Sequence, residues 1–216
     1  MAETKLTPLY LKTVAQKFDL ETVTILKLRE KNIQGNVGSL GECVNALYVD
    51  LSKNRLTVIS GMENLNKLKV LNLSYNKLTT CDALKGCVSL MRLELQGNLL
   101  KDTKPIERIE EGLTNLVGLY LQEFNGEASN PCCRLPNYKD SVRKALPSLK
   151  ALDGQRLNLG DGLDMKNLGI EDQDGDNLED LLNEYSASEI IFYSEELERG
   201  CNSDGPKMGA TVRAEV

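Results

Sequence analysis

Three asparagines, Asn54, Asn76 and Asn98, stand 22 residues apart, and each ends the same run of regularly spaced apolar residues. A polar residue and four apolar ones that recur together at a fixed interval indicate one structural unit repeated along the chain. Such a unit cannot bury its apolar edge alone, so neighbouring units must stack into a solenoid. The three runs are Ala46-x-x-Val49-x-Leu51-x-x-Asn54-x-Leu56, Leu68-x-x-Leu71-x-Leu73-x-x-Asn76-x-Leu78 and Leu90-x-x-Leu93-x-Leu95-x-x-Asn98-x-Leu100.

This phrase is the leucine-rich repeat, and it predicts the fold class. Alternate residues at its centre point into the core, as on a strand, and the residues between them point outward. The asparagine lies where the chain leaves the strand, and its amide can satisfy backbone groups of neighbouring turns. We therefore expect an α/β fold: a right-handed leucine-rich-repeat solenoid with a curved parallel β-sheet, a helical N-terminal cap and a C-terminal cap.

Imperfect copies of the phrase flank the three regular ones, giving about five repeats over residues 23–136. In the first copy Lys31 occupies the asparagine position, and in the last copy Phe124 does. Terminal repeats are often atypical. The step from Leu95 to Leu121 is 26 residues, and the extra length contains Pro105, Ile106 and Ile109, which predict a short helix on the outer side.

Both ends of the solenoid need a cap. Residues 1–22 are expected to form the N-terminal cap, with Thr7 capping a helix that begins near Pro8 and presents Leu11, Val14, Ala15 and Phe18 on one face. Residues 137–158 are expected to form the C-terminal cap. There Asn137 would cap a helix, and the cap's apolar residues are Tyr138, Val142, Ala145, Leu146, Leu149 and Leu152.

The residue types argue against an enzyme. The chain has no histidine, which removes the usual general base and the commonest zinc ligand. It also has no phosphate-binding glycine motif and no Cys-x-x-Cys pair, so no cofactor or metal is expected. We find no signal peptide and no membrane span, and we interpret the six cysteines as buried or half-buried thiols in a reducing compartment.

The net charge of −6 is unevenly distributed. Between Glu171 and Arg199 there are eleven acidic residues and one basic residue, so this segment carries −10 and the rest of the chain +4. The basic residues are scattered among acidic ones, and we do not expect nucleic-acid binding. Residues 159–216 are expected to be an acidic, largely flexible tail with short helices. Its apolar residues, among them Leu178 and Phe192, could pack on the solenoid or on a partner, and the sequence favours neither.

A binding surface is expected on the outward positions of the strands, which would form the concave face. Exposed apolar and aromatic side chains on such a face are typical of a protein interface. The alternative is that the tail or a neighbouring loop covers them. The predicted partner-binding residues are Ile25, Lys27, Leu47, Tyr48, Asp50, Val70, Asn72, Tyr75, Met91, Arg92, Glu94 and Tyr120, while Asn54, Asn76 and Asn98 are predicted to be structural.

The phrases and the closing Leu146-Pro147-x-Leu149-x-x-Leu152-Asp153-Gly154 resemble the intracellular leucine-rich-repeat class typified by the regulatory subunit of protein phosphatase 1. Stretches such as 26–29 and 97–100 resemble its small ciliary and axonemal members. The resemblance implies a non-enzymatic adaptor that binds protein partners, in the cytoplasm or cilium, as a monomer within a larger complex and without contact to membrane. The alternative is a nuclear regulator that acts through its acidic tail, as a phosphatase inhibitor or histone chaperone.

Overall fold

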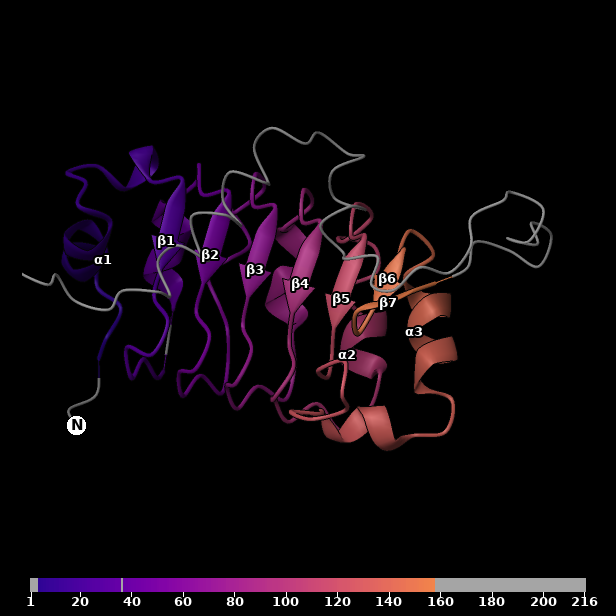
Figure 1. The fold of residues 1–216 in the computed structure, drawn as a ribbon. Helices are drawn as coiled ribbons and strands as arrows, with labels where there is room; N and C mark the ends of the chain where they lie inside the picture. Colours follow the sequence, from indigo (N-terminus) through magenta and orange to yellow (C-terminus); the bar gives the residue numbers. More distant parts are fainter. Residues whose placement is uncertain (1–3, 36, 158–216) are drawn as a thin grey trace, which may run out of the picture. The chain divides into compact units, whose positions relative to one another are not determined.

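The computed structural model describes residues 4–35 and 37–157, and its central element is one seven-stranded sheet (Figure 1). The strands follow one another in chain order, and neighbours from β1 to β6 are parallel. The last strand pairs antiparallel, which the sequence did not predict. The predicted leucine-rich-repeat solenoid is confirmed. The strands are β1 (Ile25–Lys27), β2 (Tyr48–Asp50), β3 (Val70–Asn72), β4 (Arg92–Glu94), β5 (Gly118–Tyr120), β6 (Ala151–Leu152) and β7 (Gln155–Arg156).

The register of the sheet aligns equivalent positions of successive repeats. Leu26, Val49, Leu71, Leu93 and Leu119 are paired in one row, and each is fully buried. Because side chains alternate along a strand, the residues on either side of this row point away from the core. This row of buried apolar residues therefore fixes which strand residues point away from the core. We call the side of the sheet that these residues form the outer sheet face; it is the expected concave face and lies opposite the short helices.

The connections on the other side of the core are mostly short helical turns. They are the 3-10 helices η1 (Leu20–Thr22), η2 (Gly38–Glu42), η3 (Asp82–Gly86) and η4 (Pro131–Arg134), and the helix α2 (Lys104–Glu107). Helix α2 is the short helix that the longer fourth repeat predicted, and both Ile106 and Ile109 are buried. Backbones of adjacent repeats come close together here, because a Cβ atom on Gly86 would lie 2.7 Å from Cα of Glu63.

Helix α1 (Pro8–Ala15) packs at the N-terminal end of the solenoid (Figure 1). The Thr7 hydroxyl accepts a hydrogen bond from the Tyr10 amide at 3.2 Å, and Leu11 is fully buried. The expected place of Phe18 on the same apolar face is wrong, since its side chain is 98% exposed. The helix ends before it, because Gln16 adopts a left-handed conformation with φ of 53°.

Helix α3 (Tyr138–Ala145) covers the other end, with Tyr138, Val142 and Ala145 buried. The predicted side-chain cap at Asn137 is wrong: its side chain makes no capping hydrogen bond, and only its carbonyl accepts from the Ser141 amide at 3.0 Å. No helix among the described residues is long and apolar enough to cross a membrane. The predictions for the acidic tail fall on residues 158–216, outside the described part of the chain.

Candidate functional site

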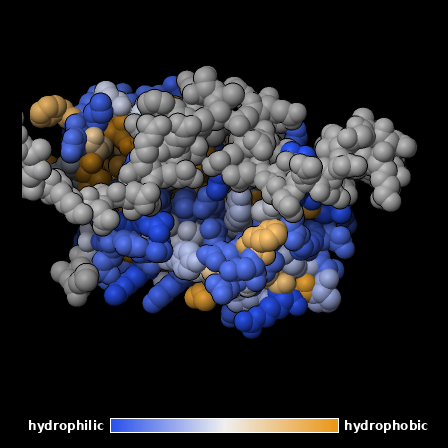
Figure 2. All heavy atoms as spheres, viewed as in Figure 1, coloured by the Kyte–Doolittle hydropathy of each residue, from blue (hydrophilic) through white to orange (hydrophobic). Residues whose placement is uncertain are grey.

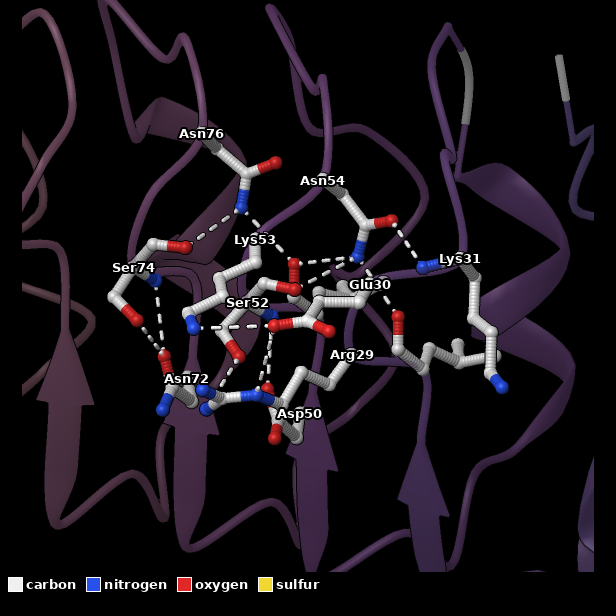
Figure 3. Close-up of polar contacts among 12 residues, drawn as sticks. Arg29, Glu30, Lys31, Asp50, Ser52, Lys53, Asn54, Asn72, Ser74 and Asn76 are labelled. Carbon is white, nitrogen blue, oxygen red and sulfur yellow. Dashed lines mark hydrogen bonds and ion pairs between the residues drawn. The ribbon is translucent and has the colours of Figure 1, made fainter. Parts of the chain in front are cut away.

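A ladder of buried asparagine side chains marks the exits of the strands (Figure 3). The Asn76 amide nitrogen donates to the carbonyls of Leu51 and Leu73, both at 3.0 Å, and its oxygen accepts from the Leu56 amide at 3.0 Å. Asn54 and Asn98 bond to their neighbouring turns in the same way. Each asparagine side chain thus joins its own turn to the preceding turn. These bonds hold the strands of the two turns in register.

The ladder continues at Asn130, which the sequence interpretation missed. Its side-chain oxygen accepts from the Leu100 amide at 3.0 Å, and its nitrogen donates to the carbonyls of Leu95 and Leu121. The expected residue at this position, Phe124, is instead 75% exposed. Residues 122–129 form an inserted loop, so the asparagine comes nine residues after Leu121 instead of three.

A sequence signal for Asn130 did exist. Regular repeats read Asn-x-Leu after the strand, and Asn130 is followed by a proline and then by the fully buried Cys132. The Cys132 amide donates to the Leu100 carbonyl at 2.9 Å. In the preceding repeat the equivalent donor is the amide of Leu99, the residue directly after Asn98. The bond is made one residue later because Pro131 has no amide hydrogen. A search that allowed a cysteine and a longer loop would have found this repeat.

An aspartate takes the next position of the ladder. One Asp153 carboxylate oxygen accepts from the Leu121 amide at 2.7 Å, and the other accepts from the Tyr138 hydroxyl at 2.6 Å. Burial and the hydrogen bond to Asp153 raise the pKa of Tyr138, so its hydroxyl stays protonated at neutral pH. The Asp153–Tyr138 pair therefore ties the C-terminal helix to the last repeat.

The predicted binding residues lie on the outer sheet face, but with unequal exposure. Lys27 and Tyr75 are exposed, whereas Ile25, Leu47, Val70, Asn72, Met91, Arg92, Glu94 and Tyr120 are half-buried. The prediction that Tyr48 is an exposed anchor is wrong, because it retains only 6% of its accessible surface. Tyr48 pairs in register with Ile25 on one neighbouring strand and with Val70 on the other. On a curved face the side chains of neighbouring strands lie close together, so little of Tyr48 remains accessible. Asp50 is also buried, at 4% exposure.

A polar network fixes the centre of this face. Arg92 forms an ion pair with Glu94 at 2.9 Å, and its guanidinium lies 5.1 Å from the centre of the Tyr120 ring. The other Glu94 oxygen accepts from the Asn72 amide at 2.7 Å. Partly buried charges that are paired and hydrogen-bonded keep a single arrangement, so the contacts of the chain itself fix the centre of this face.

A second set of charges lies at the strand exits (Figure 3). Lys53 pairs with Glu30 at 3.1 Å, and this contact lowers the pKa of Glu30. The Tyr75 hydroxyl donates to a Glu123 carboxylate oxygen, which raises the pKa of Tyr75. Loop 122–129, which displaces the asparagine of the last repeat, thus contacts the third repeat. In the space-filling view, hydrophilic residues predominate on the described surface and hydrophobic ones appear in a few separate places (Figure 2).

The cysteines within the described residues are free thiols, as predicted. Cys43, Cys81, Cys87 and Cys132 are buried and Cys133 is half-buried. Burial raises the pKa of Cys43 to about 11 and that of Cys87 to about 12, so both stay protonated and unreactive at neutral pH. Across residues 4–35 and 37–157, no group of three or more acidic, cysteine or histidine side chains is placed to hold a metal ion.

Comparison with known proteins supports the repeat assignment. The leucine rich repeat family pattern matches residues 48–100. Acidic leucine-rich nuclear phosphoprotein 32 family member A of Drosophila melanogaster is 34% identical over 137 residues, which cover 63% of this chain and 50% of that protein. Human leucine-rich repeat-containing protein 61 is 38% identical over 153 residues, which cover 71% of this chain and 58% of that protein. The chain thus spans only half to three fifths of these relatives.

Two solved structures show the same fold. One is the SNF/U2A′ complex of Drosophila melanogaster, with 26% identity, a TM-score of 0.59, and coverage of 72% of this chain and 86% of the matched chain. The other is internalin C2 of Listeria monocytogenes, with 22% identity, a TM-score of 0.51, and coverage of 67% and 61%. The stacked phrases, the asparagine ladder and these matches lead to one conclusion: this chain is a leucine-rich-repeat protein.

Proposed function

We propose that this protein is a non-enzymatic adaptor that binds a protein partner on the outer sheet face, within a ciliary, axonemal or other cytoskeletal assembly. Leucine-rich repeats are typically protein-interaction modules. The observation that carries the proposal is the composition of this face, where half-buried Val70 and Met91 adjoin the fixed Arg92–Glu94 pair. Apolar side chains around ordered arginine and tyrosine are characteristic of the centres of interfaces.

The half-buried apolar residues are better test positions than Tyr48, whose replacement would also leave a cavity. Val70 lies at the centre of the face on β3, where it pairs in register with Tyr48 and Arg92. Val88 offers a matched control, since it is a 46% exposed valine outside the strands, next to η3. The same substitution at both positions separates an effect on the face from a general effect of added charge.

We expect Val70→Glu to weaken partner binding at least tenfold, because a buried carboxylate at an apolar interface has no compensating partner. Val88→Glu should bind as the unmodified protein does. The measurement is proximity labelling with mass spectrometry in ciliated cells, for both variants. Axonemal or cytoskeletal proteins should be lost with Val70→Glu alone. Equal labelling by the two variants would exclude the outer sheet face, and a purely nuclear set of proteins would exclude the ciliary assignment.

A second candidate function is a nuclear regulator that acts through the acidic tail. It is favoured by the similarity to the acidic nuclear phosphoprotein and by the charge of −10 between Glu171 and Arg199. Deleting residues 160–216 should leave the melting temperature of the repeats within about 2 °C, because Tyr138 and Asp153 already close the solenoid. The same deletion should abolish binding to basic nuclear proteins if this second function is correct, and retention of that binding would reject it.

A further inference from the structure

Loop 122–129 is an insertion that the stacking of the repeats does not require. Asn130, which follows the loop, makes the same three ladder bonds as Asn76 in the shorter third repeat. None of the side chains of residues 122–129 is buried in the core. Binding residues are often found on loops that a rigid scaffold positions, so this loop is a candidate contact surface.

Hydrogen bonds hold the loop in one conformation. The Glu123 amide donates to the Glu127 carbonyl at 3.0 Å, which closes the loop on itself. Two further bonds attach it to the repeats before it: the Tyr75 hydroxyl donates to a Glu123 carboxylate oxygen, and the Gly97 amide donates to the Ala128 carbonyl. The loop is therefore ordered in the free protein, and a partner that binds it loses little affinity to the ordering of a flexible segment.

This ordered loop presents a large apolar side chain to solvent. Phe124 is 75% exposed. A Cβ atom on Gly154 would lie 3.6 Å from Cδ2 of Phe124 and 3.9 Å from Cε1 of Tyr120, so the two rings flank the same glycine. Because Tyr120 belongs to β5, the loop adjoins the outer sheet face. An aromatic ring that is both fixed and exposed is a typical anchor of a protein interface.

The charge of the loop is negative and is not neutralised by the described part of the chain. Residues 122–129 include Glu123 and Glu127 and no lysine or arginine. Glu123 is bonded to a neutral hydroxyl, and the described residues form no ion pair with either carboxylate. Lys53 and Arg29, at the neighbouring strand exits, pair with Glu30 instead. A partner that places basic residues around apolar ones would complement this surface.

We propose that loop 122–129 is a second docking surface, on which Phe124 anchors a partner segment whose apolar side chains are flanked by lysine or arginine. The apolar side chains enclose the ring, and the basic ones pair with Glu123 and Glu127. Aromatic faces also attract cations, so the ring and the carboxylates select the same kind of segment. This contact goes beyond the proposed binding on the outer sheet face, which Val70→Glu tests separately.

A phage-displayed library of random peptides, applied to the intact protein, tests the proposal. Peptides that bind the Phe124→Ala variant are removed first, because that variant retains every charge of the chain, including the acidic residues 171–199. It loses only an exposed side chain, so it should fold normally. The remaining peptides that bind the unmodified protein should combine apolar residues with lysine or arginine. Recovery of no such peptide, or of acidic or neutral peptides alone, would overturn the proposal.

The affinity of a selected peptide, measured by fluorescence anisotropy, separates the roles of the ring and of the charges. Phe124→Ala should weaken binding at least tenfold. Glu123→Gln combined with Glu127→Gln should weaken it at least threefold at low salt, and high salt should remove most of this difference. Glutamine keeps an acceptor for the Tyr75 hydroxyl, so the loop conformation is retained. Unchanged affinity in the double variant would reject a basic partner segment.

Two matched controls show whether the effects belong to this loop. Leu9, on α1, is also 75% exposed, and Leu9→Ala should bind the peptide as the unmodified protein does. Glu110 and Glu111 are exposed glutamates outside the loop, and their combined replacement by glutamine should have no effect. If either control weakened binding as much as the matching loop variant, loop 122–129 would not be the docking surface.

Discussion

Asn76→Ala should destabilise the solenoid by about 3 kcal/mol, because it leaves several buried backbone groups unpaired. The substitution removes the acceptor of the Leu56 amide and the donor to the Leu51, Leu73 and Ser74 carbonyls. Asn76 is only 6% exposed, so water cannot easily replace these bonds. For a chain of this size the loss corresponds to a melting temperature lower by roughly 6 to 12 °C, which calorimetry or circular dichroism would measure.

The control for this prediction is Asn64→Ala, at an exposed asparagine in the turn that precedes β3. It should change the melting temperature by no more than about 1 °C. The ladder also predicts that Asn130→Ala destabilises as strongly as Asn76→Ala, whereas Phe124→Ala has almost no effect. If Phe124→Ala proved the more damaging of the two, Asn130 could not occupy the ladder position in the last repeat.

The core and its register could be predicted from the sequence because each repeat imposes the same constraint. Leu71 and Leu93 are buried in the same row, since 22 residues return the chain to the same point one strand further along. The short helix in the fourth repeat could also be predicted, because Pro105 and two isoleucines have positional preferences that act locally. In this repeat the local preferences and the stacking of repeats favour the same helix, so it could be predicted without knowledge of distant contacts.

Two of the failed predictions depend on contacts between segments distant in sequence, and a third, at Phe18, depends on where helix α1 ends. Asn130 was missed because loop 122–129, which contacts Tyr75, breaks the fixed spacing, so only a pattern that tolerates a longer loop would locate it. Tyr48 follows the outward periodicity, yet the curvature and neighbours of the sheet decide its exposure. Phe18 continues the helical pattern beyond the residue where α1 ends. Sequence periodicity therefore located the outer sheet face, while the exposure of each residue on it required the folded chain.

Gly86→Ala should destabilise the protein by about 3 kcal/mol or more, through direct overlap between adjacent repeats. A Cβ atom at this position would lie 2.6 Å from the carbonyl carbon of Glu63 and closer still to its oxygen. These are backbone atoms of the preceding repeat, so a side-chain rotation cannot relieve the overlap and the repeats must separate. Lys85→Ala, at the preceding exposed residue, is the control and should be nearly neutral in thermal unfolding.

Because the Lys85 carbonyl faces Gly112 in the same way, Gly112→Ala should repeat the effect of Gly86→Ala. A melting temperature unchanged by either glycine substitution would mean that the turns of the solenoid do not stack this closely.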